Sequence, residues 1–184
     1  MLSRTGIVPI SSTLDTPGPM TRSVKDNAIF LSAMLGEDIE DAATKGNNRQ
    51  LNYLDYLNTS TLRGKRLGVI KELLTDSIYR RTIQILKRAG AELVEFEQPQ
   101  VSLNGFLTLL NIDMKQDLPI YLKNYADSSL EISSVEDVVQ LNLQDSLMRA
   151  PYGQELFKGI LKDSTTTEEF ELVKENLNKN GIEF

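Results

Sequence analysis

The feature that most limits the possible folds is a strand–helix–strand pattern between residues 62 and 97. Residues 66–70 (RLGVI) form a short apolar run typical of a buried strand, and residues 91–96 (AELVEF) alternate apolar and polar side chains as a second strand does. Residues 77–89 between them have helical spacing. The predicted shared face of this helix consists of Ile78, Thr82, Ile85, Leu86 and Ala89. Two strands joined by one helix predict a parallel pair with a right-handed crossover, and therefore an α/β fold.

The chain before this pattern is predicted to be a loop followed by one helix. Residues 1–20 contain three prolines, each of which favours an extended conformation in the residue before it. A helix is predicted over residues 21–36, with Ser23 as its N-cap and Gly36 at its end.

An acidic connection is predicted after this helix. Residues 37–50 are polar, and their carboxylates lack the glycine and the ligand spacing of an EF-hand. We interpret these carboxylates as a solvated acidic loop. They belong to Glu37, Asp38, Glu40 and Asp41.

The chain after residue 101 is predicted to be mostly helical, over residues 102–181. One helix, over about residues 103–118, carries Asp113 on an otherwise apolar side, and we expect this carboxylate to bond backbone groups of another segment. Pro119 falls near the middle or the end of that helix. Ser134 is predicted to open a further helix, with Asp137 in the capping-box position.

The last helix is predicted over residues 167–180, with Gly181 as its stop and residues 182–184 beginning a strand. Residues 1–184 are predicted to form a single partial domain.

Composition excludes several classes of site. The 184 residues contain no cysteine and no histidine, so a disulfide framework, a histidine-containing zinc site and a Ser-His-Asp triad are absent from the sequence. The net charge of −6 argues against a nucleic-acid partner. The sequence suggests no metal or cofactor. A basic group on residues 77–89 is interpreted as a solvated helix face. It consists of Arg80, Arg81, Lys87 and Arg88.

Targeting signals are missing from the sequence as well. No apolar run approaches the roughly 20 residues of a membrane span, and the first residues do not have the pattern of a signal peptide. The lack of cysteine fits a reducing compartment, and we predict a cytoplasmic location.

The residues alone do not assemble a complete active site. Without histidine, a serine nucleophile needs a lysine partner. Ser23 and Lys25 are two residues apart on a helix and point to different faces, so Ser23 is interpreted as a cap. Ser11 and Ser12 are interpreted as loop hydroxyls. The RGKRLG stretch at residues 63–68 lacks the spacing of a P-loop and precedes a strand instead of a helix.

The opening of the chain resembles a known family. Residues 3–11 (SRTGIVPIS), residues 14–20 (LDTPGPM) and residues 22–26 (RSVKD) are similar to the segment that follows the signature stretch of amidase signature enzymes. The resemblance is closest to the peptide-amidase-like branch and extends along nearly the whole chain. Further similar stretches are LRGKRLG at 62–68, RAGA at 88–91, LLNIDMK at 109–115, YL at 121–122 and GQE at 153–155.

The resemblance implies hydrolysis of a linear amide by a Ser–Ser–Lys triad, and a partial α/β fold with a mixed sheet flanked by several helices. In the family, the three catalytic residues and the oxyanion hole lie before the segment with which this chain begins. No residue here matches the triad, so no catalytic residue is assigned. We expect a central-to-C-terminal fragment that is inactive alone. The resemblance places Asp15, Thr16 and Gly18 at the wall of the substrate site, in a supporting role.

The expected partners follow from the same resemblance. The intact enzyme is expected to bind a small-molecule amide or a peptide amide. The alternative is a non-catalytic interaction module, or a split-enzyme subunit that needs an N-terminal partner chain. Self-association is a further expectation, because a fragment of a sheet exposes strand edges and apolar patches.

Overall fold

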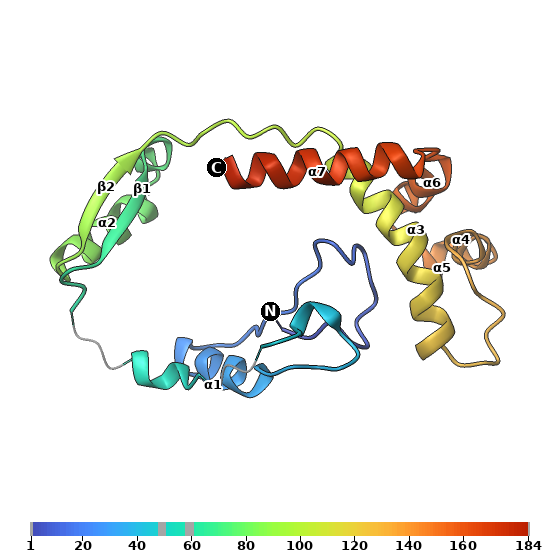
Figure 1. Cartoon of the computed structure of the whole chain (residues 1–184), viewed down its shortest axis with the longest axis horizontal. Coiled ribbons are helices and arrows are strands. Elements are labelled where there is room, and N and C mark those ends of the chain that lie inside the picture. The colour runs from blue at the N-terminus through green and yellow to red at the C-terminus, as the bar shows by residue number, and fades with distance from the viewer. Residues whose placement is uncertain (1, 48–50, 58–60, 184) are drawn as a thin grey trace. The chain divides into compact units, whose positions relative to one another are not determined.

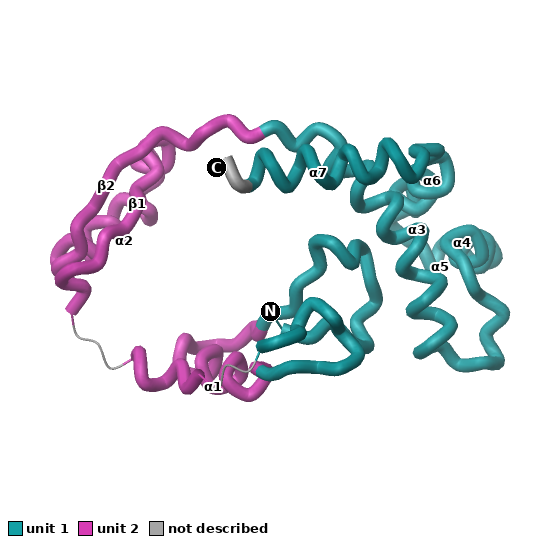
Figure 2. The backbone as a smooth tube through the Cα atoms, in the orientation of Figure 1, with its two compact units in different colours: residues 1–18, 36–49, 102–184 teal, residues 19–35, 50–101 magenta. Residues whose placement is uncertain are grey.

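A computed structural model describes residues 2–47, 51–57 and 61–183 of the chain (Figure 1). The chain divides into two compact units, which Figure 2 colours separately. The first unit consists of residues 1–18, 36–49 and 102–184, and the second of residues 19–35 and 50–101. The prediction of an α/β fold is confirmed, with strands in the second unit and helices in both.

The second unit contains the predicted strand–helix–strand element. Strand β1 (Arg66–Ile70) pairs in parallel with strand β2 (Glu92–Phe96), and helix α2 (Ser77–Arg88) is the connection between them. The 3-10 helix η3 (Lys71–Thr75) joins β1 to α2. The Tyr79 hydroxyl accepts a hydrogen bond from the Ile70 amide at 3.0 Å, and this bond ties the first turn of α2 to the end of β1.

The inward face of α2 agrees with the predicted face only in part. Leu86 and Ala89 are half-buried as predicted, whereas Ile78 is 76% exposed and Ile85 is 54% exposed. Tyr79 is half-buried in their place, and its hydrogen bond to β1 turns this side of the helix towards the strand. Periodicity alone does not decide between two neighbouring helix faces.

The second unit also contains helix α1 (Val24–Met34) and the 3-10 helix η2 (Tyr53–Tyr56). Ser23 is confirmed as the N-cap of α1, because its hydroxyl accepts a hydrogen bond from the Asp26 amide at 3.1 Å. The Ser32 hydroxyl of α1 accepts a hydrogen bond from the Tyr53 amide at 3.1 Å, which connects α1 to η2.

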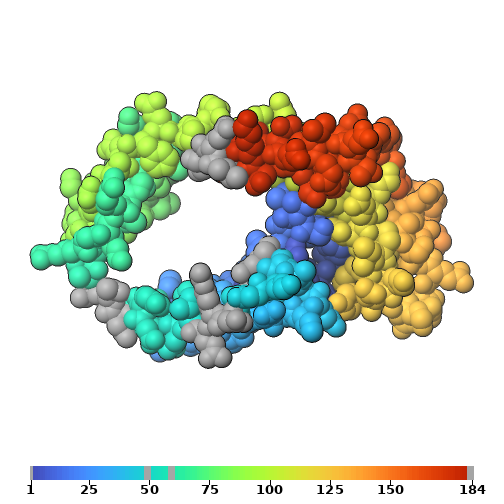
Figure 3. All heavy atoms as spheres, viewed as in Figure 1, coloured from blue at the N-terminus to red at the C-terminus, as the bar shows by residue number. Residues whose placement is uncertain are grey.

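The first unit is built around helix α3 (Phe106–Tyr125), which continues through Pro119. Helix α7 (Thr167–Glu183) packs against the first half of α3, as Figure 3 shows. Their apolar contact consists of Leu109, Ile112 and Phe170. At Gly105, which precedes α3, φ is +84° and an added Cβ would lie 2.8 Å from Val173 of α7, so this close packing requires glycine.

The first unit also contains four shorter elements. They are η1 (Ala42–Thr44), α4 (Val135–Leu143), α5 (Ser146–Arg149) and α6 (Glu155–Lys162). Of these, α4 and α6 pack against α3, and α5 packs against α4. Leu118, Val135 and Ile160 form the apolar cluster between α3, α4 and α6. Ser134 caps α4 as predicted, because its hydroxyl accepts a hydrogen bond from the Asp137 amide at 3.1 Å.

The end of the chain corrects a prediction. Gly181 does not stop the last helix, and residues 182 and 183 continue α7 instead of beginning a strand. Residue 184 lies outside the described residues. A glycine inside a helix costs about 1 kcal/mol relative to alanine, and the helix end that favours glycine is the one in which this residue adopts a left-handed conformation. Gly181 does not have a positive φ. Among the described residues, no helix is long and apolar enough to cross a membrane.

Candidate functional site

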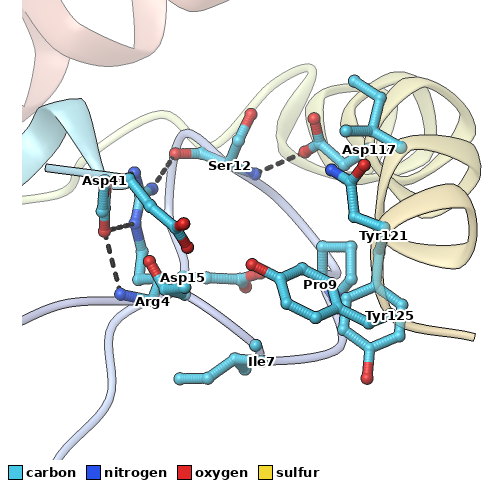
Figure 4. A pocket seen from close by; sticks show the side chains of 14 residues that line it. Arg4, Ile7, Pro9, Ser12, Asp15, Asp41, Asp117, Tyr121 and Tyr125 are labelled. Carbon is cyan, nitrogen blue, oxygen red and sulfur yellow. Dashed lines mark hydrogen bonds and ion pairs between the residues drawn. The ribbon is translucent and has the colours of Figure 1, made fainter.

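The opening loop of the first unit is held by an ion pair that involves its first basic residue. The Arg4 guanidinium contacts the Asp41 carboxylate through Nη2 at 2.7 Å and through Nε at 3.0 Å. The Arg4 backbone amide donates to the same carboxylate at 2.9 Å, and the third guanidinium nitrogen donates to the Ser12 carbonyl oxygen (Figure 4). Arg4 therefore connects the start of the loop, its middle at Ser12 and the segment that contains η1.

This ion pair corrects the interpretation of residues 37–50 as a solvated acidic loop at Asp41, whereas Glu37 and Glu40 are exposed as interpreted. Asp41 is buried, and its carboxylate also accepts the Ala43 amide at 3.1 Å as the cap of η1. Hydrogen bonds from Arg4 lower the pKa of Asp41 well below its usual range, and the same interaction raises the pKa of Arg4. One carboxylate of this acidic segment thus pairs with a half-buried cation of the loop, since the Arg4 side chain is 19% exposed.

The neighbouring carboxylate of Asp38 makes a second contact with the opening loop. It accepts hydrogen bonds from the hydroxyls of Ser3 and Thr5. These two bonds lower the pKa of Asp38, since they stabilise its ionised form. Thr44 is fully buried beneath this contact, and its hydroxyl accepts the Asp38 amide at 2.8 Å.

A buried polar contact joins the loop to helix α3. The Ser11 hydroxyl donates to the Asp113 carboxylate, and the Thr13 amide donates to the same oxygen at 3.3 Å. Ser11 is fully buried and Asp113 is 3% exposed. The prediction that Asp113 bonds backbone groups of another segment is confirmed. Ser11 is a loop hydroxyl, as interpreted, and one that anchors the loop.

The turn at residues 10–15 is closed by Asp15. Its Oδ2 atom accepts the Ile10 amide at 2.8 Å and the Ser11 amide at 2.9 Å. One helical turn after Asp113 on α3, the Oδ2 atom of Asp117 accepts the Ser12 amide at 2.7 Å. The loop thus has a definite conformation although it contains no helix or strand, because carboxylates satisfy its backbone amides.

Three cavities of the described residues lie along this loop. The largest has a volume of about 720 Å³, and Thr13 and Leu14 line it together with side chains of α3 and α7, but none of the residues predicted for the substrate-site wall does. The second has a volume of about 260 Å³, and Asp15 lines it together with side chains from the loop, from residues 40–41 and from the second half of α3. The third has a volume of about 220 Å³, and both Asp15 and Thr16 line it. Asp15 and Thr16, two of the three residues predicted for a substrate-site wall, therefore line the same cavity.

Gly18 lies apart from these cavities. It is exposed, and an added Cβ would meet no atom within 4 Å. The role predicted for it at the wall stays a prediction.

Sequence reasoning did not find the residues that hold the loop, apart from Asp113. Arg4 is the only basic residue among the first 21 positions, and this isolation could have indicated a specific acidic partner. Asp117 follows Asp113 by four residues and therefore lies on the same helix face. Neither signal identifies the partner residue, because Arg4 lies 37 residues before Asp41 and Asp117 lies 105 residues after Ser12.

Comparison with known proteins shows similarity to amidases and to an amidotransferase subunit. Residues 1–178 match the family described as Amidase. A probable amidase of Arabidopsis thaliana is 32% identical over the whole of this chain, which spans 38% of that relative. One subunit of the glutamyl-tRNA(Gln) amidotransferase of Zymomonas mobilis is 36% identical over 65% of this chain, which corresponds to 26% of its own length.

A solved structure agrees with these relatives. The native peptide amidase of Stenotrophomonas maltophilia superposes with a TM-score of 0.81 and 31% identity, over 95% of this chain and 38% of that protein. The chain therefore spans less than half the length of each of these three proteins.

Proposed function

The chain belongs to the amidase family, and we propose that it is the part of an amide hydrolase that supports the catalytic centre without supplying its catalytic groups. The reaction is hydrolysis of the C–N bond of a linear amide or a peptide amide. Within these 184 residues no position matches the Ser–Ser–Lys triad expected from the family resemblance. We therefore propose that the chain is inactive alone. Its cytoplasmic location stays a prediction.

The anchored loop is the observation that supports this proposal. It contains the stretch most similar to the family, and the contacts of Arg4, Ser11 and Asp15 hold it in one conformation. A wall beside a reacting group needs this fixed geometry, because small displacements reduce the rate of a positioned reaction. Asp15 and Thr16 are the proposed wall residues, with Gly18 next to them in the chain.

Two assays test the proposal. In the first, the purified chain is incubated with a C-terminally amidated dipeptide, and ammonia release is expected to equal that of buffer. In the second, this chain replaces the matching segment of the Stenotrophomonas peptide amidase. The hybrid is expected to release ammonia, and a control hybrid without the nucleophilic serine is expected to release none. Turnover by the chain alone, or a folded hybrid that is inactive, contradicts the proposal.

The wall assignment has its own variants in the hybrid. Asp15→Asn keeps an oxygen for the Ile10 and Ser11 amides but removes the charge, so we expect a higher KM with a smaller change in kcat. Glu136→Gln, on the exposed side of α4, removes one charge elsewhere and serves as the matched control. Equal kinetics for the two variants contradicts the assignment of Asp15.

A second candidate function is that of a non-catalytic subunit or interaction module. It is favoured by a run of exposed apolar side chains within ten residues around α5 and the start of α6. These are Leu147, Met148, Tyr152 and Leu156, each at least 77% exposed. Exposed apolar groups of this kind favour a protein partner or a second copy of the chain. The amidotransferase relative is named as a subunit, which is consistent with a partner chain.

Size-exclusion chromatography with light scattering separates the two candidates. A monomer that melts cooperatively favours an independent module. Self-association that Leu147→Ser abolishes indicates a surface that is normally covered. Restored amide hydrolysis when a separate N-terminal chain is added identifies a split enzyme.

A further inference from the structure

The cavity of the first unit that Asp15, Asp41 and Asp117 line has a composition that suits a particular ligand chemistry. Two aromatic side chains of α3, Tyr121 and Tyr125, lie one turn apart with ring centroids 5.2 Å from each other and form one wall (Figure 4). Pro9 and Ile7 of the loop supply apolar surface beside them. The cavity of about 260 Å³ lies just below the range of about 300–1,000 Å³ typical of pockets for drug-sized ligands, so it suits a smaller molecule.

The charges around this cavity are unbalanced. Four carboxylates and one guanidinium line it, which leaves a formal charge of −3. Each of the three guanidinium nitrogens of Arg4 already donates a hydrogen bond, to Asp41 or to the Ser12 carbonyl, and the Asp41 carboxylate neutralises its charge.

Two of the carboxylates keep an oxygen for a ligand. Asp15 and Asp117 each use only Oδ2 to accept backbone amides of the loop. Within the described part of the chain, their Oδ1 atoms accept no hydrogen bond. These carboxylates are held in place by the loop and by α3, so their free oxygens are acceptors that are positioned before a ligand arrives.

From this combination we propose that the cavity is a binding site for a small organic cation, with an ammonium group attached to an apolar body. The ammonium group is held by the free oxygens of Asp15 and Asp117 and by the faces of Tyr121 and Tyr125, because aromatic rings attract cations through their negative faces. The apolar body lies against Ile7 and Pro9. The inference goes beyond the proposed amide hydrolysis and does not depend on it, since binding is a property of the chain itself.

The test is a titration of the isotopically labelled 184-residue chain, followed by two-dimensional NMR. The probes are benzylammonium and its neutral counterpart benzyl alcohol, which have the same ring and differ in the charged group. Benzylammonium is expected to bind saturably with a Kd of about 1 mM or below, with chemical-shift changes confined to residues 4–15, 40–41 and 117–125. Benzyl alcohol is expected to bind several-fold more weakly, because it lacks the charge.

Matched variants assign the binding to the named groups. Asp117→Asn keeps an oxygen for the Ser12 amide and removes the charge, so we expect binding about threefold to tenfold weaker. Tyr125→Leu keeps the apolar bulk of a half-exposed side chain and removes the ring, with a loss of about threefold. Glu136→Gln, which removes a charge outside the cavity, is expected to leave the Kd unchanged.

Three results overturn the proposal. Equal affinity for the two probes shows an apolar hollow without a preference for cations. An equal loss for Asp117→Asn and Glu136→Gln shows non-specific attraction to an acidic chain. Chemical-shift changes that grow linearly with the benzylammonium concentration and do not saturate show that no site is present. Loss of amide hydrolysis in the hybrid enzyme, by contrast, bears only on the proposed function.

Discussion

The opening loop of the first unit and the strand–helix–strand element of the second are held together in opposite ways. The loop contains no strand and no helix, yet its ion pair joins the buried Asp41 to the half-buried Arg4, with side chains 6% and 19% exposed. The strand–helix–strand element is regular, yet its Arg66–Glu92 ion pair is 71% and 65% exposed, and α2 presents Ile78 to solvent. Regular secondary structure and tight anchoring are therefore separate properties in this chain.

The physical reason lies in where the polar groups are satisfied. In the strand–helix–strand element the backbone amides donate to backbone carbonyl oxygens, so few of them need a side-chain acceptor. In the loop the backbone amides of residues 10–13 bond to the carboxylates of Asp15, Asp113 and Asp117. These acceptors cannot be removed without leaving amides unsatisfied, and we expect mutations in the loop to be the more costly ones.

The largest effect is expected at the Arg4–Asp41 ion pair. Arg4→Ala leaves the buried Asp41 carboxylate without its cation, and we expect the free energy of unfolding to fall by about 3 kcal/mol. Urea denaturation followed by circular dichroism measures this loss. The matched control is Arg66→Ala at the exposed pair. Equal losses for the two variants would contradict the contrast between the two regions.

Acid should weaken the same ion pair. Because the pKa of Asp41 is depressed in the folded chain, its contribution to stability is complete above the unfolded value, which is about 3.9. That contribution is lost as the pH falls below this value towards the folded pKa. We expect urea midpoints to fall as the pH is lowered through this range, and Asp41→Asn to show a shallower decrease. Parallel pH profiles for the two proteins would refute the assignment.

A smaller loss is expected at the contact between the loop and α3. Asp113→Ala leaves the buried Ser11 hydroxyl and the part-buried Thr13 amide without this acceptor, at a cost of about 2 kcal/mol. In a double-mutant cycle with Ser11→Ala, the two losses are expected to be less than additive. Hydrogen exchange at the Thr13 amide should accelerate in Asp113→Ala. Strict additivity would show that the two side chains do not interact.

A helix cap of the second unit is expected to matter less. Ser23→Ala removes the acceptor of the Asp26 amide at the start of α1, and typical caps contribute about 1 kcal/mol. Ser23→Gly should cost only a few tenths of that amount, since glycine is tolerated at this position. Thermal unfolding of the three proteins checks this order, and the reverse order would argue against a capping role.

The smallest effect is expected at the exposed ion pair of the sheet. Arg66→Ala breaks the contact with Glu92, which joins side chains that water already solvates. Such pairs contribute about 0.2–1 kcal/mol, so the change should lie at the lower end of that range and vanish in high salt. A loss comparable to that of Arg4→Ala would remove the distinction between the two regions.

Local patterns in the sequence predicted most elements of the fold. The apolar run at 66–70 and the alternation at 91–96 lead to parallel strands at 66–70 and 92–96. Caps at Ser23 and Ser134 are also confirmed. The patterns were insufficient on α2, where two neighbouring helix faces have the same spacing of apolar residues. They were also insufficient at Gly181, which adopts an ordinary helical conformation and does not end its helix.

The candidate site was predicted in part. The family resemblance directed attention to Asp15 and Thr16, and the structure places both beside one cavity. Asp41 was interpreted as solvated because its neighbours in the chain are acidic and polar, whereas its cation lies 37 residues earlier. Composition describes the neighbours of a residue in sequence, and burial depends on its neighbours in space.

The sequence by itself determined the α/β class, the positions of most helices and strands, and the family, because these depend on short-range periodicity, caps and contiguous motifs. Only the tertiary structure decided which face of α2 is buried, which carboxylates hold the opening loop, and that Tyr121 and Tyr125 share a cavity with Asp15 and Asp117. These features depend on contacts between segments that are distant along the chain. Such contacts form when hydrogen-bond partners and apolar faces meet in three dimensions, and no local pattern encodes the identity of the partner.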